Sequence, residues 1–402
     1  MRIVCAGGGP AGLYFAICAK RRDAGHEIAV VERDPRGATY GWGVGYWDDL
    51  LDVMYRHDRV SAQKLRAASF VWQGRKVVRG EQAAYLGGSG YSVNRSTLLE
   101  ILTERAEELG VEIRHEIAAA DHDGFSAADL IVAADGSRSQ IRTAHAESFG
   151  SRTRTGRNRF IWLGTEQRFK QMVIAMEQTD AGWMWFYGYP SAPGISTCVV
   201  ECPPETWTGL GLDSANHEDG VRILESVFRK ALGGNSLISS DRGRPAQWAQ
   251  YVETSNETFH HANIALVGDA AHTVHFTMGS GTGLAMMDAC ELAASLHRRP
   301  ALSDALERYS RKRRSALHRV AAAGRTSMMW FENADNSFGD DVVDVAYALA
   351  WRYHPEEPWG YASHRAAQFP IVRHGRDRYD HARRWYLARR RGEPLLPPTR
   401  RS

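Results

Sequence analysis

The 402-residue sequence predicts an α/β protein in which a doubly wound parallel sheet is interrupted by an antiparallel sheet. An apolar run over residues 2–6, a glycine-rich turn, a buried helix and a second apolar run that stops at Glu32 form a strand–turn–helix–strand unit, the opening of a doubly wound sheet. Between about 151 and 257 the pattern changes to short apolar runs separated by Gly, Pro and charged turns, which is typical of antiparallel strands. Apolar runs ending in polar turns, at 129–136 and 263–269, indicate further buried strands on either side of this insertion.

The predicted domain boundaries follow from these changes of pattern. A discontinuous nucleotide-binding domain comprises residues 1–69, 91–150 and 258–345, with helices expected after Asn94, Gly281 and Ser303. The β-sheet domain comprises 70–90 and 151–257, because the apolar run that begins at Phe70 is expected to join the antiparallel sheet. Residues 346–402 are expected to form a helical and basic C-terminal segment.

Composition excludes several classes of protein. The 50 basic and 47 acidic side chains leave a net charge of +3, so bulk charge gives no sign of a nucleic-acid-binding protein. Only the end of the chain is basic, with ten Arg against Asp377, Asp380 and Glu393 between residues 371 and 402. The five Cys form no C-x-x-C pair and no metal-ligand spacing, which predicts a reduced, cytoplasmic protein without a metal site. No apolar run approaches the ~20 residues of a membrane-spanning helix, and the oligomeric state stays open.

The first motif, Gly7-x-Gly9-x-x-Gly12, lies between the first strand and the first helix. Its glycines permit a tight turn and the close approach of a pyrophosphate, which rests on the N-terminus of the helix begun by Pro10 and Ala11. Glu32 follows Gly12 by twenty residues and is placed, with Arg33 beside it, to bind a ribose hydroxyl. An acidic residue there favours a ribose without a 2′-phosphate, so the expected cofactor is FAD or NAD.

Two further motifs favour FAD. Gly268-Asp269 ends a strand, and a glycine-rich turn then opens a helix whose free N–H groups could meet the pyrimidine edge of a flavin, where negative charge accumulates on reduction. The residues of this turn that we assign to the cofactor are Gly279, Gly281, Thr282 and Gly283. Asp135-Gly136 is the third motif, and alone it indicates only a turn.

Together these motifs resemble the single-component (group A) FAD-dependent aromatic hydroxylases, over about residues 1–335. The resemblance implies a Rossmann-like FAD-binding domain of the GR2, p-hydroxybenzoate hydroxylase type, interrupted by a β-sheet substrate domain. It implies that Asp269 holds the ribityl chain, that Trp42 and Arg95 belong to the FAD site with Arg95 near the phosphates, and that Asp135 serves both flavin and a transiently bound nicotinamide. NAD(P)H would reduce the flavin, O2 would form the C4a-hydroperoxyflavin, and its distal oxygen would pass to an electron-rich ring.

Longer strings narrow the resemblance. Residues 41–44, 156–165, 272–282 and 330–335 are similar to the branch that contains salicylyl-CoA 5-hydroxylases and 2-aminobenzoyl-CoA monooxygenases, and to the tryptophan-derivative hydroxylase of violacein biosynthesis. This implies an aromatic substrate, in the first place an aryl-CoA thioester such as salicylyl-CoA. The chain departs from the aryl-CoA pattern after Val44, so an indole-derived or other biosynthetic aromatic is the alternative. A flavin-binding or electron-transfer protein without hydroxylase activity is the alternative from another class.

Substrate-site candidates come from the same region of the chain. His275 lies between Asp269 and the glycine-rich turn, where it could bind a phenol or arylamine and raise the electron density of the ring, or simply pack as a core histidine. Phe276 follows it. Four aromatic residues alternate along one expected strand, which puts a pair of them on one side of the sheet, either above the flavin or, as we favour, in the core between domains. They are Trp183, Trp185, Tyr187 and Tyr189.

Two other patterns in the sequence bear on its function. The string from Gly182 to Trp185 is similar to a halogenase motif, but the continuation Phe186-Tyr187-Gly188 argues against halogenation. In the basic tail, Arg373 and Arg376 could hold CoA phosphates, although a solvated, partly disordered end is the simpler interpretation.

Overall fold

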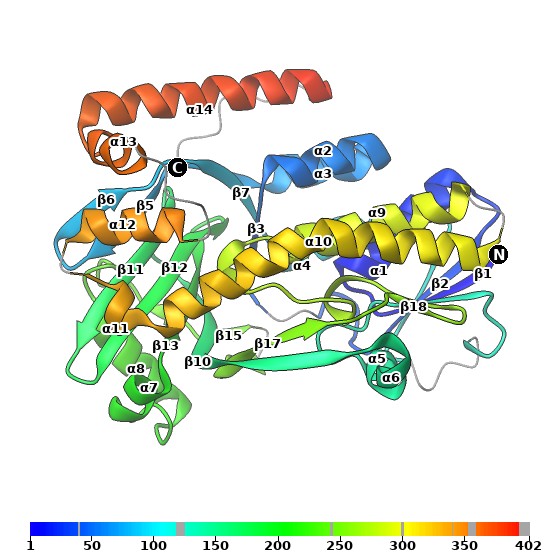
Figure 1. Cartoon of the computed structure of the whole chain (residues 1–402), viewed down its shortest axis with the longest axis horizontal. Helices are drawn as coiled ribbons and strands as arrows, with labels where there is room; N and C mark the ends of the chain where they lie inside the picture. The colour runs from blue at the N-terminus through cyan, green and yellow to red at the C-terminus, as the bar shows by residue number, and fades with distance from the viewer. Residues whose placement is uncertain are drawn as a thin grey trace.

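The computed structural model describes residues 1–38, 41–117, 125–241, 244–298, 301–339, 341–352 and 359–393. Figure 1 shows a parallel sheet with its helices on the right and an antiparallel sheet on the left, with the long helix α10 (Leu302–Glu332) running from one to the other. The α/β fold with an interrupted parallel sheet is therefore as predicted.

The parallel sheet has six strands in the order β18-β19-β9-β1-β2-β8. All neighbours are parallel except β18 and β19. The chain leaves the central strand β1 toward β2 on one side and adds β9 on the other, so the order reverses beside β1, where α/β sheets bind their ligands. The strands are β1 (Arg2–Ala6), β2 (Glu27–Glu32), β8 (Glu112–His115), β9 (Leu130–Ala133), β18 (His260–His261) and β19 (Ile264–Leu266).

Helices cover this sheet. Helix α1 (Pro10–Arg22) is buried from Ala11 to Ala19 because it packs between α4 (Arg95–Glu108) and α9 (Gly281–Arg298). Helix α4 begins as predicted, since the side chain of Asn94 accepts a hydrogen bond from the Ser96 N–H and caps it. Four further helices belong to this half of the molecule, namely α2 (Asp48–His57), α3 (Arg59–Ala68), α5 (Gln140–Ala144) and α6 (Ala146–Phe149).

The second sheet has the order β14-β10-β13-β12-β11-β5-β6, with β17 added on β10. One face packs on α7 (Pro204–Gly209) and α8 (His217–Val227), and the other packs on the end of α10, α11 (Ala334–Ser337) and α12 (Val342–Trp351). Its strands are β5 (Arg75–Arg79), β6 (Gln82–Tyr85), β10 (Arg152–Thr165), β11 (Met172–Thr179), β12 (Gly182–Ala192), β13 (Ile195–Cys202), β14 (Leu237–Ile238) and β17 (Ala249–Ser255). A separate two-stranded sheet joins β15 (Ser240–Asp241) and β16 (Arg244–Pro245).

The segment that begins at Phe70 corrects one expectation. Its first part, β4 (Phe70–Gln73), pairs with β7 (Ser89–Asn94) in a three-stranded sheet that also contains β3 (Gly43–Tyr46). Only its second part, β5, joins the antiparallel sheet, and does so parallel to β11. The chain turns between the two at Gly74, whose φ of +79° lies in the left-handed region that favours glycine.

The C-terminal segment continues in two helices, α13 (Gly360–Ala366) and α14 (Pro370–Arg391). Helix α14 lies along the top of the molecule above α2 and has no buried residue (Figure 1). Polar contacts hold it there: Arg391 pairs with Asp48, Asp52 and Glu393, and Arg384 donates to Gln73 at 2.8 Å. The described part of the basic tail is therefore a helix held on the surface by polar contacts, with most of its side chains exposed.

All five Cys are buried free thiols. Within the described ranges, no helix combines the length and apolarity needed to cross a membrane.

Candidate functional site

The glycine-rich turn after β1 contains two kinds of glycine. A Cβ on Gly7 would lie 2.3 Å from the Ala134 carbonyl oxygen, and one on Gly12 would lie 2.1 Å from that of Gly7. These two positions are closed by protein, and the φ of Gly7 is +113°. A Cβ on Gly9 would meet nothing within 4 Å. Gly9 therefore faces open space at the start of α1, where the first backbone N–H groups of the helix favour an anion.

Glu32, at the end of β2, braces this turn. Its Oε2 accepts a hydrogen bond from the Gly8 N–H at 2.7 Å, and its Oε1 accepts one from the Asp34 N–H at 3.0 Å. Each carboxylate oxygen can accept a second bond, so both can still bind a hydroxyl. The next residue, Arg33, is exposed.

Asp269 lies in the tight turn η3 (Gly268–Ala270) that follows β19. Asp269 is exposed, but the protein atoms packed around its carboxyl group raise the pKa of that group, against the opposing effects of His272 and Arg95. Arg95 opens α4, and its backbone N–H donates to the Trp42 carbonyl at 2.8 Å. The structure thus brings together Asp269, Arg95 and Trp42, three positions far apart in the sequence.

Sequence reasoning missed Asp288, which is hydrogen-bonded to the residues on either side of Asp269. Asp288 is fully buried in α9, where its Oδ2 accepts bonds from the Gly268 N–H at 2.9 Å and from His272 at 2.7 Å. Its Oδ1 accepts a bond from Arg313 at 2.5 Å. Burial raises the pKa of Asp288, but His272 and Arg313 outweigh it and the net shift is downward. An acidic residue within an apolar helical stretch is the signal that could have found it.

Asp135 caps a helix in addition to lying near the site. Its Oδ2 accepts hydrogen bonds from the Gln140 and Ile141 N–H groups at the start of α5. Arg142 of that helix donates to the carbonyls of Ser137 and Ala270, at 2.8 and 3.1 Å. Arg142 therefore ties the Asp135 turn to the Asp269 turn.

The turn from Gly279 to Gly283 leads into α9. Gly279 has a φ of +61°, and a Cβ on Gly281 would meet nothing within 4 Å. Thr282 is half-buried and Gly283 is buried within the first turn of α9. Asp135 Oδ1 and Ser280 Oγ are among the described side-chain atoms that are buried without a hydrogen-bond partner in the protein. These features fit FAD. Gly9 and Gly281 leave open space at the starts of two helices, Glu32 offers acceptors at the end of β2, and the two polar atoms lack partners in the protein.

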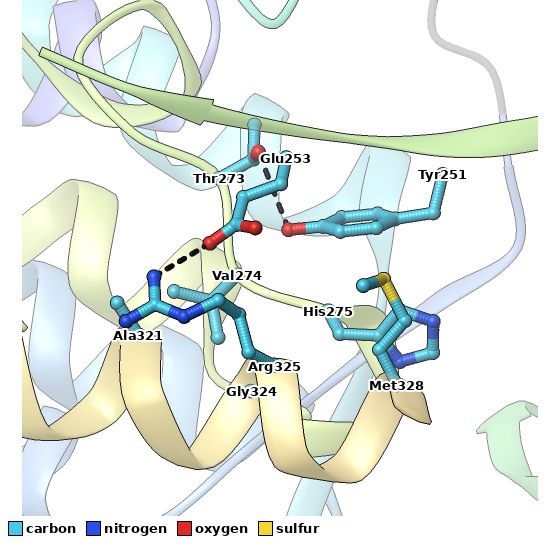
Figure 2. Close-up of a pocket in the computed structure, with 9 residues that line it drawn as sticks. All are labelled: Tyr251, Glu253, Thr273, Val274, His275, Ala321, Gly324, Arg325 and Met328. Carbon is cyan, nitrogen blue, oxygen red and sulfur yellow. Dashed lines mark hydrogen bonds and ion pairs between the residues drawn. The ribbon is translucent and has the colours of Figure 1, made fainter. Parts of the chain in front are cut away.

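His275 is 4% exposed and lies beside a crevice between α10 and β17 (Figure 2). Its Nδ1 lies 2.8 Å from Thr277 Oγ1, and its ring meets the Tyr251 ring edge to face at 4.8 Å between centroids. Burial, and then the positive charge of Arg352, lower the pKa of His275 to about 3, so the imidazole is neutral. The other end of the crevice is closed by an ion pair of 2.8 Å between Arg325 and Glu253 (Figure 2).

The aromatic residues of β12 lie in two different environments. Trp183 and Trp185 are buried against Phe338, and Trp185 also stacks on Phe331. They therefore lie in the core between sheet and helices. Tyr187 belongs to the same core but also contacts the half-buried Phe276, at 6.1 Å between ring centroids. Tyr189 instead reaches β3, where its hydroxyl donates to the Gly43 carbonyl at 2.8 Å.

Two of the strings singled out in the sequence, 41–44 and 156–165, interlock. A Cβ on Gly41 would lie 2.4 Å from the Trp162 ring, and a Cβ on Gly164 would lie 2.9 Å from the Trp42 ring. Trp42 Nε1 also donates to the Trp162 carbonyl at 3.4 Å. Each tryptophan thus fills the space left by the glycine of the other segment.

The sheet carries a buried acid that sequence reasoning also missed. Glu201 on β13 is 1% exposed, and its carboxylate accepts bonds from Asn158 at 2.9 Å, Trp185 at 3.1 Å and Tyr187 at 3.4 Å. Burial raises its pKa from 4.5 to about 7, against the opposing effect of these donors.

We expect Glu201→Gln to be more stable than the wild type at pH 8 but not at pH 4. The pKa of Glu201 is raised in the folded state, so its protonated form stabilises the fold below pH 4.5 and this stabilisation is lost as the pH rises through about 7. The difference in free energy of unfolding between variant and wild type should change by roughly 3 kcal/mol over that range. Urea titrations at several pH values measure it, and a difference independent of pH would contradict the expectation.

Arg373 and Arg376 are exposed on α14. Arg376 donates to Ser363 Oγ at 2.6 Å, and the guanidinium of Arg373 lies 5.6 Å from the centre of the Tyr85 ring. They lie on the surface near one another and not among the residues of the Asp269 turn.

Comparison with known proteins decides the family. Residues 1–323 match the family described as FAD binding domain. The chain belongs to the FAD-binding, group A aromatic monooxygenases. The fit of the glycine turns to FAD and the single dinucleotide fingerprint agree with this membership.

Three relatives show how far the similarity extends along the chain. Salicyloyl-CoA 5-hydroxylase of Streptomyces sp. is 32% identical, over 100% of this chain and 77% of the relative. The 3-hydroxy-4-methyl-anthranilyl-[aryl-carrier protein] 5-monooxygenase of Streptosporangium sibiricum is 33% identical, over 88% of this chain and 96% of the relative. Protodeoxyviolaceinate monooxygenase of Chromobacterium violaceum is 27% identical, over 83% of this chain and 90% of the relative.

Among solved structures, P. aeruginosa PqsL in complex with 2-aminobenzoylacetate superposes with a TM-score of 0.68 at 19% identity. The match covers 88% of this chain and all of PqsL. It confirms the predicted fold.

Proposed function

We propose that this monooxygenase uses NAD(P)H and O2 to hydroxylate the activated ring of an aryl-CoA thioester such as salicylyl-CoA. The observation that carries the proposal is the similarity to salicyloyl-CoA 5-hydroxylase, which extends over the whole chain and so includes the basic helix α14. Guanidinium groups bind phosphates and stack on aromatic bases, and Arg373 and Arg376 are exposed on that helix.

The proposed cofactor site uses the residues around the end of β1. The Gly9 turn and the first N–H groups of α1 would hold the pyrophosphate, and Glu32 would accept bonds from the ribose. Asp269 would bind the ribityl hydroxyls, with Arg95 balancing its charge, and the start of α9 would face the pyrimidine edge. When bound, FAD supplies the transfer of electrons from NAD(P)H and the activation of O2.

The proposed substrate site lies next to Phe276 and Tyr187. These two rings would form an apolar wall for the aromatic ring. His275 would bind an oxygen or nitrogen of the substrate through Nε2, since its Nδ1 already contacts Thr277. Because burial keeps the imidazole neutral, its contribution is a directed hydrogen bond and not a positive charge.

The second candidate is hydroxylation of a tryptophan- or indole-derived intermediate. The similarity to protodeoxyviolaceinate monooxygenase favours it, although that match is weaker and covers less of the chain. A flavin-binding protein without hydroxylase activity is the candidate from another class.

The test is to follow NADH and NADPH oxidation by the flavin-loaded protein with salicylyl-CoA, salicylate and tryptophan in parallel, and to weigh the products. We expect stimulation, and a product heavier by one oxygen atom, only with the thioester. A response to tryptophan would favour the second candidate. Nicotinamide oxidation that no aromatic ligand stimulates would favour the flavin carrier.

The double variant Arg373→Ala/Arg376→Ala should raise the KM for a CoA thioester about tenfold, since losing charge-assisted contacts to phosphate costs about 1.4 kcal/mol. The KM for the free acid should not change. Arg152→Ala/Arg222→Ala is the matched control, because it removes two charges that are 78% and 68% exposed on other elements. An equal change for thioester and free acid would remove α14 from CoA binding.

A further inference from the structure

A chain of hydrogen bonds connects α12 to His275. Arg352, which follows α12, donates from Nε to Ser327 Oγ at 2.7 Å. Ser327 Oγ lies 2.8 Å from Thr277 Oγ1, which in turn lies 2.8 Å from His275 Nδ1. Three separate segments contribute, because Ser327 belongs to α10 and Thr277 to the turn η4 (Phe276–Met278). We call these three residues and His275 the relay.

The starting point of the relay is fixed by packing. One face of α12 is buried through Val342, Val345, Ala346 and Leu349 against the antiparallel sheet. At its end, Arg352 donates to the Leu349 carbonyl and its guanidinium lies 5.8 Å from the centre of the Phe331 ring. Docking of α12 therefore sets where the guanidinium points.

The number of protons in the relay gives it a direction. A guanidinium can only donate, and each hydroxyl has one proton. Ser327 accepts from Arg352, so its own proton is available for Thr277, and the Thr277 proton is then available for His275 Nδ1. In the reverse order Ser327 Oγ would accept from both Arg352 and Thr277, and its own proton would have no acceptor among the described residues. The relay therefore ends on an Nδ1 that accepts.

The neutral imidazole has one proton for two ring nitrogens. Burial and the nearby Arg352 keep His275 neutral at the pH of the cell, so its hydrogen-bond partners decide which ring nitrogen holds the single proton. If Nδ1 accepts from Thr277, the proton must be on Nε2. His275 then offers an N–H to a ligand and has no lone pair free to take a proton.

We propose that Arg352 is a positioning residue which, through Ser327 and Thr277, holds His275 in the tautomer with its proton on Nε2. The substrate atom that His275 binds is then an acceptor, such as a phenolate or carbonyl oxygen, and not a hydroxyl whose proton the imidazole removes. This inference extends the proposed function, in which His275 contacts the substrate, but the tautomer itself can be measured without any substrate.

The experiment is NMR of the full-length, flavin-loaded protein labelled with ¹⁵N in its histidines, because a ring nitrogen that carries a proton is well separated in shift from one that does not. His275→Gln assigns the signals by difference. We expect Nε2 protonated and Nδ1 unprotonated in the wild type. A protonated Nδ1, or an equal mixture of tautomers, would overturn the proposal.

Variants test the relay itself. Thr277→Val keeps the shape but removes the hydroxyl, and Arg352→Met removes the charge, so both should produce a mixture of tautomers. Thr277→Ser keeps the hydroxyl and should keep the wild-type signals. Arg325→Met is the control, because Arg325 lies in the same crevice but pairs with Glu253 (Figure 2). Unchanged tautomers in both Thr277→Val and Arg352→Met would show that the relay does not set the tautomer.

Activity separates this proposal from the proposed function. If His275 contacts the substrate, Thr277→Val and Arg352→Met should lower hydroxylated product per NAD(P)H consumed, and Thr277→Ser should restore it for the threonine position. Tautomers that shift as expected with unchanged product yield would leave the relay in place and remove His275 from the substrate site.

Discussion

Asp288→Ala is expected to lower the free energy of unfolding by about 3–5 kcal/mol and to release FAD, because breaking a buried ion pair leaves its partner uncompensated. Arg313 and His272 are each 8% exposed, and the Gly268 N–H is buried, so none of the three can turn to water when the carboxylate is lost. Gly268 directly precedes Asp269, so the loss should also disorganise the turn that we assign to the ribityl chain.

Glu291→Ala is the matched control for this experiment. Glu291 lies on the same helix, pairs with Lys312 at 3.2 Å, and its side chain is 24% exposed. Partly exposed ion pairs of this kind contribute little, so the control should lose less than about 1 kcal/mol and keep its flavin. Urea unfolding followed by circular dichroism, together with the flavin content of the purified protein, measures both effects. Equal stability of the two variants would contradict the role of Asp288.

The second large effect is expected from two glycine substitutions with different consequences. Gly12→Ala should disrupt the fold, and Gly9→Ala should weaken only the binding of FAD. A Cβ on Gly12 would lie 2.1 Å from the Gly7 carbonyl oxygen, a backbone atom that cannot move aside, and such overpacking costs about 3 kcal/mol. A Cβ on Gly9 meets no protein atom within 4 Å, and the φ of −74° at Gly9 suits alanine.

Gly9→Ala should therefore fold with nearly wild-type stability in the flavin-free form but bind FAD at least about tenfold more weakly, a loss of roughly 1.4 kcal/mol. Titration of the flavin-free protein with FAD, followed by flavin fluorescence, measures the affinity. Full affinity in Gly9→Ala would show that the pyrophosphate does not approach this turn.

Local pattern was sufficient to predict the elements whose burial follows directly from the sequence. The unit from β1 to β2 and the capped helix α4 have the expected bounds to within a few residues, because apolar runs, glycine turns and the Asn94 cap act locally. The division at Gly74 was not predicted, since β4 and β5 form one apolar run in the sequence and their partners lie elsewhere in the chain.

The residues that support the site also could not be predicted from the sequence pattern. Asp288 acts on a turn 20 residues earlier in the chain, and Arg352 reaches His275 through two hydroxyls on two other elements. Contacts of this kind depend on how helices dock, which no periodicity in a single sequence encodes. The motifs predict FAD and propose where it binds, whereas the residues that orient those motifs became visible only in the tertiary structure.

The interlocked Gly41–Trp162 and Trp42–Gly164 pairs have a consequence for recombination between relatives. The two segments are separated by more than a hundred residues of chain, yet each indole needs the other segment's glycine. A chimera that exchanges the β-sheet domain but keeps the parent's first fifty residues will be tolerated only if both donors have the same glycine and tryptophan in each segment. Crossover points for directed evolution of substrate range are therefore best placed so that residues 41–44 and 156–165 are inherited together.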